Sequence, residues 1–291
     1  MDFLSTFRIG SLLVIALVYM LFDLFNNRNV PSIFAYATVA FGALMTIAYY
    51  PNLQVMGISA LIALIICGLG YFLYRTGQIG AADVTEMAAI SLILPIQPVA
   101  YLAADPQFGL PFILSVFLAA GVFALLMIPL YYMPRAGLLK RGLGKMVKNR
   151  DIFKGVVLGA AYAAFLVFTA YYFPLSTIGV IAVVVVMACS IATAVFERPI
   201  TDSMVKYLPI SQLEEGDIIA FNLMNAKDIS AMRRRVKSFD RLATIELIKK
   251  LKASKVRSKL PVYRSAMPLA LPLFIGVVAS LLLGNVILLV I

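Results

Sequence analysis

The sequence contains no histidine, and cysteine is almost as scarce. Without an imidazole, histidine-based catalysis and histidine ligation of a metal are both excluded. The two cysteines, Cys67 and Cys189, lie in separate apolar runs, where we expect them to be small buried hydrophobic residues. They provide neither a disulfide framework nor a zinc site, so chemistry in this chain has to come from other side chains.

Charged residues are rare as well. They make up 13% of the chain, whereas hydrophobic residues make up 62% and the mean hydropathy is +0.96. Soluble globular proteins carry about twice that charged fraction, so the composition indicates a polytopic membrane protein. Most of the charges fall in two stretches, 134–154 and 197–264.

Apolar runs long enough to cross a bilayer recur along the chain, at about 20 residues each. The candidates are 7–25, 31–50, 55–74, 84–104, 110–132, 155–173, 176–196 and 265–290. No small-residue cleavage pattern follows the first run, so we expect a retained helix and not a removed signal peptide. The predicted fold class is an all-α polytopic membrane protein with about eight transmembrane helices and a small cytoplasmic insert.

These runs and the charged stretches divide the chain into five segments. The segments are a membrane core of about five helices at 1–133, a basic cytoplasmic loop at 134–154, two transmembrane helices at 155–196, a small basic cytoplasmic insert at 197–264 and the last transmembrane helix at 265–291. Lysine and arginine set the orientation, because short basic loops remain in the cytoplasm. With 134–154 inside, both termini lie outside, and every lysine and arginine except Arg8 lies on the cytoplasmic side.

Two aspartates mark the ends of apolar runs in the membrane core. Asp23 closes the first run, and Asp83 opens the fourth after the turn Gly80-Ala81-Ala82. The predicted topology places both at the cytoplasmic surface, where they can meet. Two close aspartates do not both ionise, so the charged one can activate water while the protonated one polarises a peptide carbonyl. Simpler explanations stay open, because Asp83 can cap its helix with Glu86 in the first turn and Asp23 can pair with Arg28.

The same residues resemble the motifs of a known enzyme family. Gly80-Ala81-Ala82-Asp83 resembles the GxGD motif of membrane aspartyl proteases, which include the type IV prepilin peptidases and the presenilins. Asp23, with Val30-Pro31 after it, resembles the first catalytic aspartate of the prepilin peptidases and its short cytoplasmic loop. The basic insert and the absence of a CxxC pair are similar to the archaeal prepilin and preflagellin peptidases.

Some positions depart from the pattern of this family. Ala82 replaces the second glycine of the motif, and Thr85 stands where a lysine usually follows the second aspartate. The stretch from Asp23 to Pro31 is slightly longer than is common. These departures bear on the local geometry of the pair more than on the identity of the two aspartates.

The resemblance implies an aspartic-type endopeptidase with Asp23 and Asp83 as catalytic residues, Gly80-Ala81-Ala82 as their supporting motif, and no metal or cofactor. Its substrates would be class III signal peptide precursors, that is, archaellins or type IV pilin-like proteins. Cleavage would fall between a short basic leader and an apolar helix, at the cytoplasmic face of the plasma membrane. Glu86 is a candidate contact for the leader.

Two other functions remain open at this level. A proton- or cation-coupled transporter could use Asp23 and Asp83 as its binding residues, although both lie at one face and not at the midplane. A lipid-phosphate transferase would use aspartates with Mg²⁺, although the neighbouring loops are basic. Ion flux would identify the first alternative, and loss of activity in a chelator would identify the second.

The insert 197–264 has its own predicted structure. A turn and strand are expected at 213–221, and amphipathic helices at 226–237 and 240–254, the second with Asp240 as its N-cap. Its basic runs, Arg233 to Arg235 and Lys249 to Lys252, favour anionic lipid headgroups as partners. Nucleic acid is not expected, because no aromatic residues are interleaved with the charge.

Overall fold

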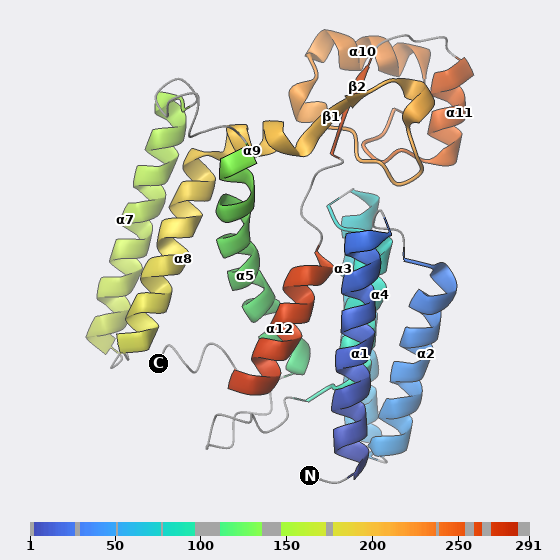
Figure 1. Cartoon of the computed structure of the whole chain (residues 1–291), viewed down its shortest axis with the longest axis vertical. Helices are drawn as coiled ribbons and strands as arrows, with labels where there is room; N and C mark the ends of the chain where they lie inside the picture. The colour runs from blue at the N-terminus through green and yellow to red at the C-terminus, as the bar shows by residue number, and fades with distance from the viewer. Residues whose placement is uncertain are drawn as a thin grey trace.

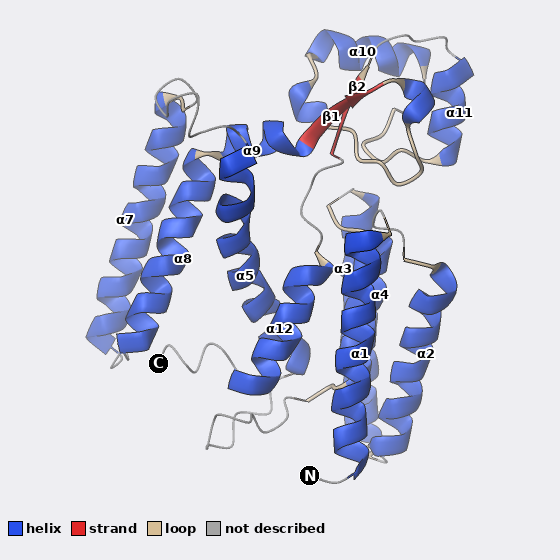
Figure 2. Cartoon of the chain, viewed as in Figure 1, coloured by secondary structure: helices blue, strands red, loops and turns tan. Residues whose placement is uncertain are grey.

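The computed structural model describes ten stretches that together cover most of the chain. They are residues 3–26, 30–50, 52–76, 78–96, 111–135, 147–172, 177–236, 239–253, 259–263 and 269–284. In these stretches helices dominate, and the strands are confined to the insert (Figures 1 and 2). The chain is therefore an all-α membrane protein with a small mixed insert, as the composition predicts.

Five helices in the described part of the chain are long and apolar enough to cross a membrane. They are α1 (Phe3–Phe25), α2 (Ser32–Tyr49), α3 (Leu53–Arg75), α5 (Phe112–Arg135) and α7 (Asn149–Tyr172). α8 (Thr177–Val195) bends by 71° into α9 (Glu197–Met204), and this pair makes a sixth span if it is counted as one.

Two of the predicted runs form shorter helices. α4 (Ala81–Ile93) has 13 residues and α12 (Ala270–Leu283) has 14, so neither reaches the length of a full span by itself. The predicted runs at 84–104 and 265–290 extend beyond these helices into residues outside the described stretches. The structure thus accounts for five to six spans.

α4 is the most buried helix of the bundle. Every residue from Met87 to Leu94 is buried, because α1, α2 and α3 all pack against it. Small residues permit the close approach: a Cβ on Gly42 of α2 would lie 2.9 Å from Leu92 Cβ, and one on Gly70 of α3 would lie 2.5 Å from Val84. The centre of the bundle is therefore defined by α4.

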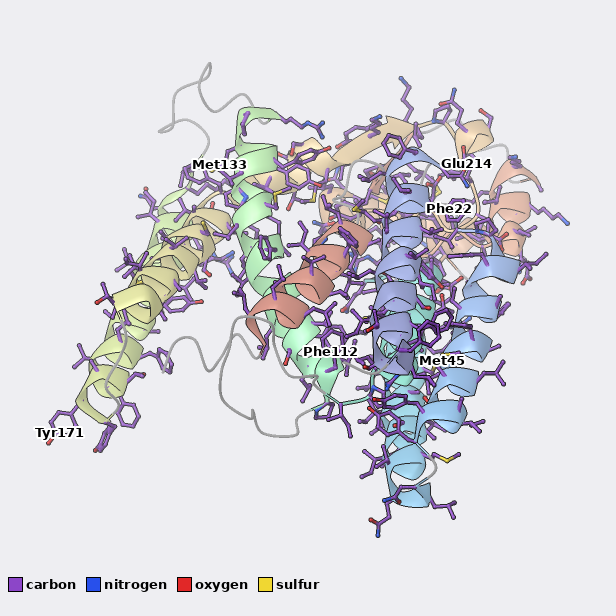
Figure 3. The ribbon with its side chains drawn as sticks, turned by 60° about the horizontal axis from the view of Figure 1, so that its bottom comes forward. Phe22, Met45, Phe112, Met133, Tyr171 and Glu214 are labelled. Atoms are coloured by element: carbon purple, nitrogen blue, oxygen red, sulfur yellow. The ribbon has the colours of Figure 1, made fainter. Side chains whose placement is uncertain are left out.

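α12 and α5 form the second contact region of the bundle. A Cβ on Gly276 would lie 2.6 Å from the carbonyl oxygen of Val116, so the two helices cross almost backbone to backbone. Figure 3 shows Phe112, at the start of α5, among the side chains where α5 and α12 meet, and it is fully buried. α12 also packs on α1, and one buried cluster joins α1, α4, α5 and α12.

α7 and α8 pair with each other at the edge of the molecule. Their outer faces are apolar and exposed, and Tyr171 projects outward at the end of α7 (Figure 3). Such a surface suits lipid contact. The prediction of buried cysteines is wrong for Cys67, which is exposed on α3, and only partly correct for Cys189, which is half-buried. A thiol facing lipid does not need cover from the protein.

The insert is a small unit with its own core. β1 (Val205–Leu208) pairs antiparallel with β2 (Leu260–Tyr263), which brings the two ends of the insert together. Between them lie η2 (Ile210–Gln212), η3 (Phe221–Leu223), α10 (Ala226–Arg235) and α11 (Ile245–Ala253). Ile219, Leu251 and Val262 are among its fully buried residues. Lys250 lowers the pKa of Glu246 through a hydrogen bond and its charge.

Two predictions within the insert need correction. α11 begins at Ile245 and not at residue 240, and Asp240 is not its N-cap. Leu242 forms a β-bridge with Ile218 instead, and the backbone N–H of Leu247 donates to Thr244 Oγ1 at the true start of the helix. The predicted strand at 213–221 is reduced to isolated bridges followed by a 3₁₀ turn.

Figure 1 shows how the helix ends are distributed. α1, α3, α5 and α8 end on the side of the bundle that carries the insert, and α2, α4, α7 and α12 begin there. α1 begins at the opposite side. This alternation matches the order of the predicted loops and brings the end of α1 and the start of α4 to one side.

Candidate site at the insert end of the bundle

Asp23 and Asp83 lie on helices that pack against each other. Asp23 is in the last turn of α1, and Asp83 is in the first turn of α4. Leu12 and Ala16 of α1 share a buried cluster with Ile90 of α4, and this apolar contact fixes the two helices side by side. Both aspartates are half-buried.

Asp23 is tied to the last helix. Its Oδ2 accepts a hydrogen bond of 3.2 Å from the backbone N–H of Ala270, the first residue of α12. A helix N-terminus carries partial positive charge, so this contact favours the ionised form of Asp23. The expected partner Arg28 lies outside the described residues. Asp23 thereby connects α1 with α12 at the insert side of the bundle.

Asp83 caps its own helix. Its Oδ2 accepts a hydrogen bond of 2.8 Å from the backbone N–H of Gly80, the N-cap residue of α4. A Cβ on Gly80 would lie 3.0 Å from that same oxygen, which explains the glycine at the first position of the motif. Ala81 is exposed and Ala82 half-buried, so an alanine is accommodated where the family pattern has its second glycine. The simpler explanation for Asp83 as a capping residue is thus realised in the structure.

Glu86 is placed differently from its predicted role. Its side chain is fully buried, and in the described part of the chain neither carboxyl oxygen has a hydrogen-bond partner. In this conformation no part of the side chain is accessible, so the predicted contact with a substrate leader requires Glu86 to become exposed. Glu86 lies instead within electrostatic range of both Asp83 and Asp23.

Sequence reasoning missed the hydroxyl network around these acids. The Tyr19 hydroxyl is hydrogen-bonded to Thr38 Oγ1 at 2.9 Å and to Thr85 Oγ1 at 3.2 Å, which links α1, α2 and α4. Thr85 is the residue that replaces the usual lysine. Tyr19 and Asp23 are four residues apart and share a face of α1, and this spacing is the signal that could have pointed to Tyr19.

The geometry sets limits on what the site can hold. In the described stretches, no group of at least three acidic or cysteine residues is arranged to hold a metal ion. The half-buried Asp23 and Asp83 are available for proton transfer with a substrate or water, and the buried Glu86 is available only to its neighbours. The carboxyls of Asp23 and Asp83 are thus groups that can give or take a proton at this end of the bundle.

The chain matches no family model, and comparisons with curated proteins and with solved structures likewise find no match.

Proposed function

We propose that the protein is a membrane aspartyl endopeptidase that removes the short basic leader of archaellin-like or type IV pilin-like precursors. One observation carries the proposal: two half-buried aspartates, Asp23 and Asp83, lie at the same end of two packed helices. Carboxyls in a membrane protein are costly, and they are retained mainly where function uses them.

The proposed mechanism uses the two aspartates as a coupled pair. One is charged and takes a proton from water, and the resulting hydroxide equivalent attacks the peptide carbonyl. The other is protonated and donates to the carbonyl oxygen as charge develops there. The pair titrates as a unit, so neither role is assigned to Asp23 or Asp83 alone.

The proposed location follows from the distribution of basic residues. The insert, Arg75 and the exposed Lys148 and Arg150 all belong to the side of the bundle where Asp23 and Asp83 lie. Basic segments remain in the cytoplasm and meet anionic lipid headgroups, so we place this side at the cytoplasmic face of the plasma membrane. In this proposal α4 and α12 are counted with α8 and the five long helices to give about eight spans, and both termini lie outside.

The test is cleavage of a precursor archaellin by detergent-solubilised protein, compared with Asp23→Asn and Asp83→Asn. Asparagine keeps a side-chain oxygen for the N–H of Ala270 or Gly80, so the hydrogen bond that holds each residue survives while the charge is lost. We expect each variant to lose activity by about 100-fold or more, the usual scale of general acid–base catalysis.

Asp151→Asn is the matched control. Asp151 also lies in the first turn of a helix, α7, and its Oδ2 accepts from the backbone N–H of Lys148 three residues earlier. It should cleave at the wild-type rate. If Asp23→Asn or Asp83→Asn also cleaves at that rate, the peptidase proposal fails, and proton or cation flux into liposomes becomes the measurement to make.

A further inference from the structure

The inference concerns Glu86, the buried acid beside the aspartate pair. Glu86 is in the second turn of α4, one helical turn after Asp83 and on the same face. Its side chain has no exposed surface, and neither oxygen has a hydrogen-bond partner among the described residues. A carboxylate in such surroundings would be very costly, whereas the neutral acid is tolerated.

The two aspartates have the opposite surroundings. Each accepts a backbone N–H, from Ala270 or Gly80, and such donors favour the charged form. Glu86 lies within electrostatic range of both aspartates, and acids coupled in this way do not all ionise, so one of the three has to retain a proton. Glu86 is the one whose side chain has no exposed surface and, among the described residues, no hydrogen-bond donor.

Among the described residues, the other helices bring no compensating charge close to Glu86. α1 contributes Asp23, the Tyr19 hydroxyl and Arg8, whose guanidinium is bound to the carbonyl oxygen of Ile93 at the far end of α4. The described α2 and α12 carry no charged residue. α3 and α5 carry one cation each, at their last residues, Arg75 and Arg135. Neither forms an ion pair with Glu86. In the part of the chain that the structure describes, no cation therefore forms an ion pair that would displace the proton on Glu86.

We infer, on the basis of the proposed peptidase, that Glu86 is a positioning residue that stores the single proton the aspartate pair needs. When a peptide carbonyl enters, the proton moves from Glu86 to the aspartate pair, which then holds one neutral acid, while Glu86 takes on a charge that its buried position disfavours. The number of protons and the net charge of the three acids are unchanged by this step. The proton returns to Glu86 when the products leave.

The test is the pH dependence of precursor cleavage by wild-type protein and by Glu86→Gln. Without the stored proton the pair must take one from solvent, where protons become scarcer as the pH rises. We expect Glu86→Gln to cleave normally at acidic pH and to lose about tenfold or more above neutrality, which moves the upper limb of the profile to lower pH. Glu215→Gln, at an exposed position in the insert, is the control and should keep the wild-type profile.

A second variant and a second readout separate this role from a structural one. Glu86→Leu removes an acid that makes no hydrogen bond, so the melting temperature should be equal to or higher than that of the wild type. Its pH profile should shift as in Glu86→Gln. A clear loss of melting temperature in both variants, or failure of both to fold, would show that Glu86 supports the fold and overturn the inference.

The outcomes also distinguish this inference from the proposed function. Wild-type protein that cleaves, with inactive Asp23→Asn and Asp83→Asn and an unchanged profile in Glu86→Gln, overturns the proton-storage role alone. Wild-type protein that cleaves no precursor at any pH overturns the peptidase and, with it, this role.

Discussion

Arg8 is a single cation held inside the bundle, at the end opposite the candidate site. Only 2% of its surface is exposed, and its guanidinium donates two hydrogen bonds, of 3.0 and 2.7 Å, to the carbonyl oxygen of Ile93 at the end of α4. The same group lies 3.9 Å from the centre of the Tyr49 ring and 4.8 Å from that of Tyr50. One side chain thus joins α1, α2 and α4, which explains a positive charge outside the predicted cytoplasmic side.

Replacing Arg8 should therefore cost stability. Arg8→Ala removes two charge-assisted hydrogen bonds and a buried cation–π contact, and we expect the free energy of unfolding to fall by about 2–4 kcal/mol. Arg135→Ala is the matched control, because Arg135 also lies 3.8 Å from a tyrosine ring, that of Tyr131, but is exposed. It should cost less than about 1 kcal/mol. Thermal unfolding in detergent measures both variants. Equal losses of stability would contradict the role of Arg8 in joining α1, α2 and α4.

At the scale of single residues, sequence reasoning locates the aspartates but not their surroundings. The positions of Asp23 and Asp83 can be predicted because the ends of the apolar runs coincide with the ends of helices. The burial of Glu86 is not found, because an acid near the start of a helix ordinarily faces solvent. Glu86 is buried because α1, α2 and α3 pack around α4. That packing depends on contacts between residues distant in sequence.

The crossing of α12 and α5 is the element-scale feature that most directly supports the site. α12 holds Asp23 through the N–H of Ala270, and its distance from α5 is set by the missing side chain at Gly276. A larger residue at 276 would push α12 away from α5. Because Asp23 is bound to the start of α12, such a displacement also changes the position of a candidate catalytic residue.

Gly276→Ala should accordingly reduce both stability and cleavage. The new methyl group would lie 2.6 Å from a backbone oxygen of Val116, which cannot move alone, and we expect a loss of about 1–3 kcal/mol in the free energy of unfolding. Gly121→Ala is the control on α5, where a Cβ meets nothing within 4 Å. Helix propensity should leave that variant unchanged or more stable by up to about 1 kcal/mol. Thermal unfolding and precursor cleavage of each variant test the prediction.

At the scale of elements, apolar length predicts the long spans and misses what tertiary contacts decide. The long helices follow the predicted runs, namely α1, α2, α3, α5 and α7. A segment inside lipid has to form the hydrogen bonds of its own backbone, and an apolar run of that length therefore becomes a helix. The start of α11 is predicted too early. The backbones of Arg241 and Ala243 form hydrogen bonds with the backbone of residues 216–219. No local sequence pattern predicts that pairing.

At the scale of the whole molecule, the proposal depends on which side of the membrane the insert occupies. The insert folds around its own core, and it lies on the side of the bundle where Asp23 and Asp83 are found (Figure 1). A leader peptide is present only in the cytoplasm before export of its precursor. The basic insert and the aspartates must therefore share the cytoplasmic side if the protein is a leader peptidase.

Cysteine labelling in intact cells tests this sidedness. Cys67 and Cys189 are first replaced by alanine, and single cysteines are then placed at two exposed positions, Glu215 in the insert and Gln54 at the start of α3 on the opposite side. Because the basic insert is retained inside, we expect a membrane-impermeant maleimide to label Gln54→Cys in intact cells and Glu215→Cys only after lysis. The reverse pattern would put Asp23 and Asp83 on the outer face, where no leader peptide is available to them, and would favour a function at the extracellular surface instead.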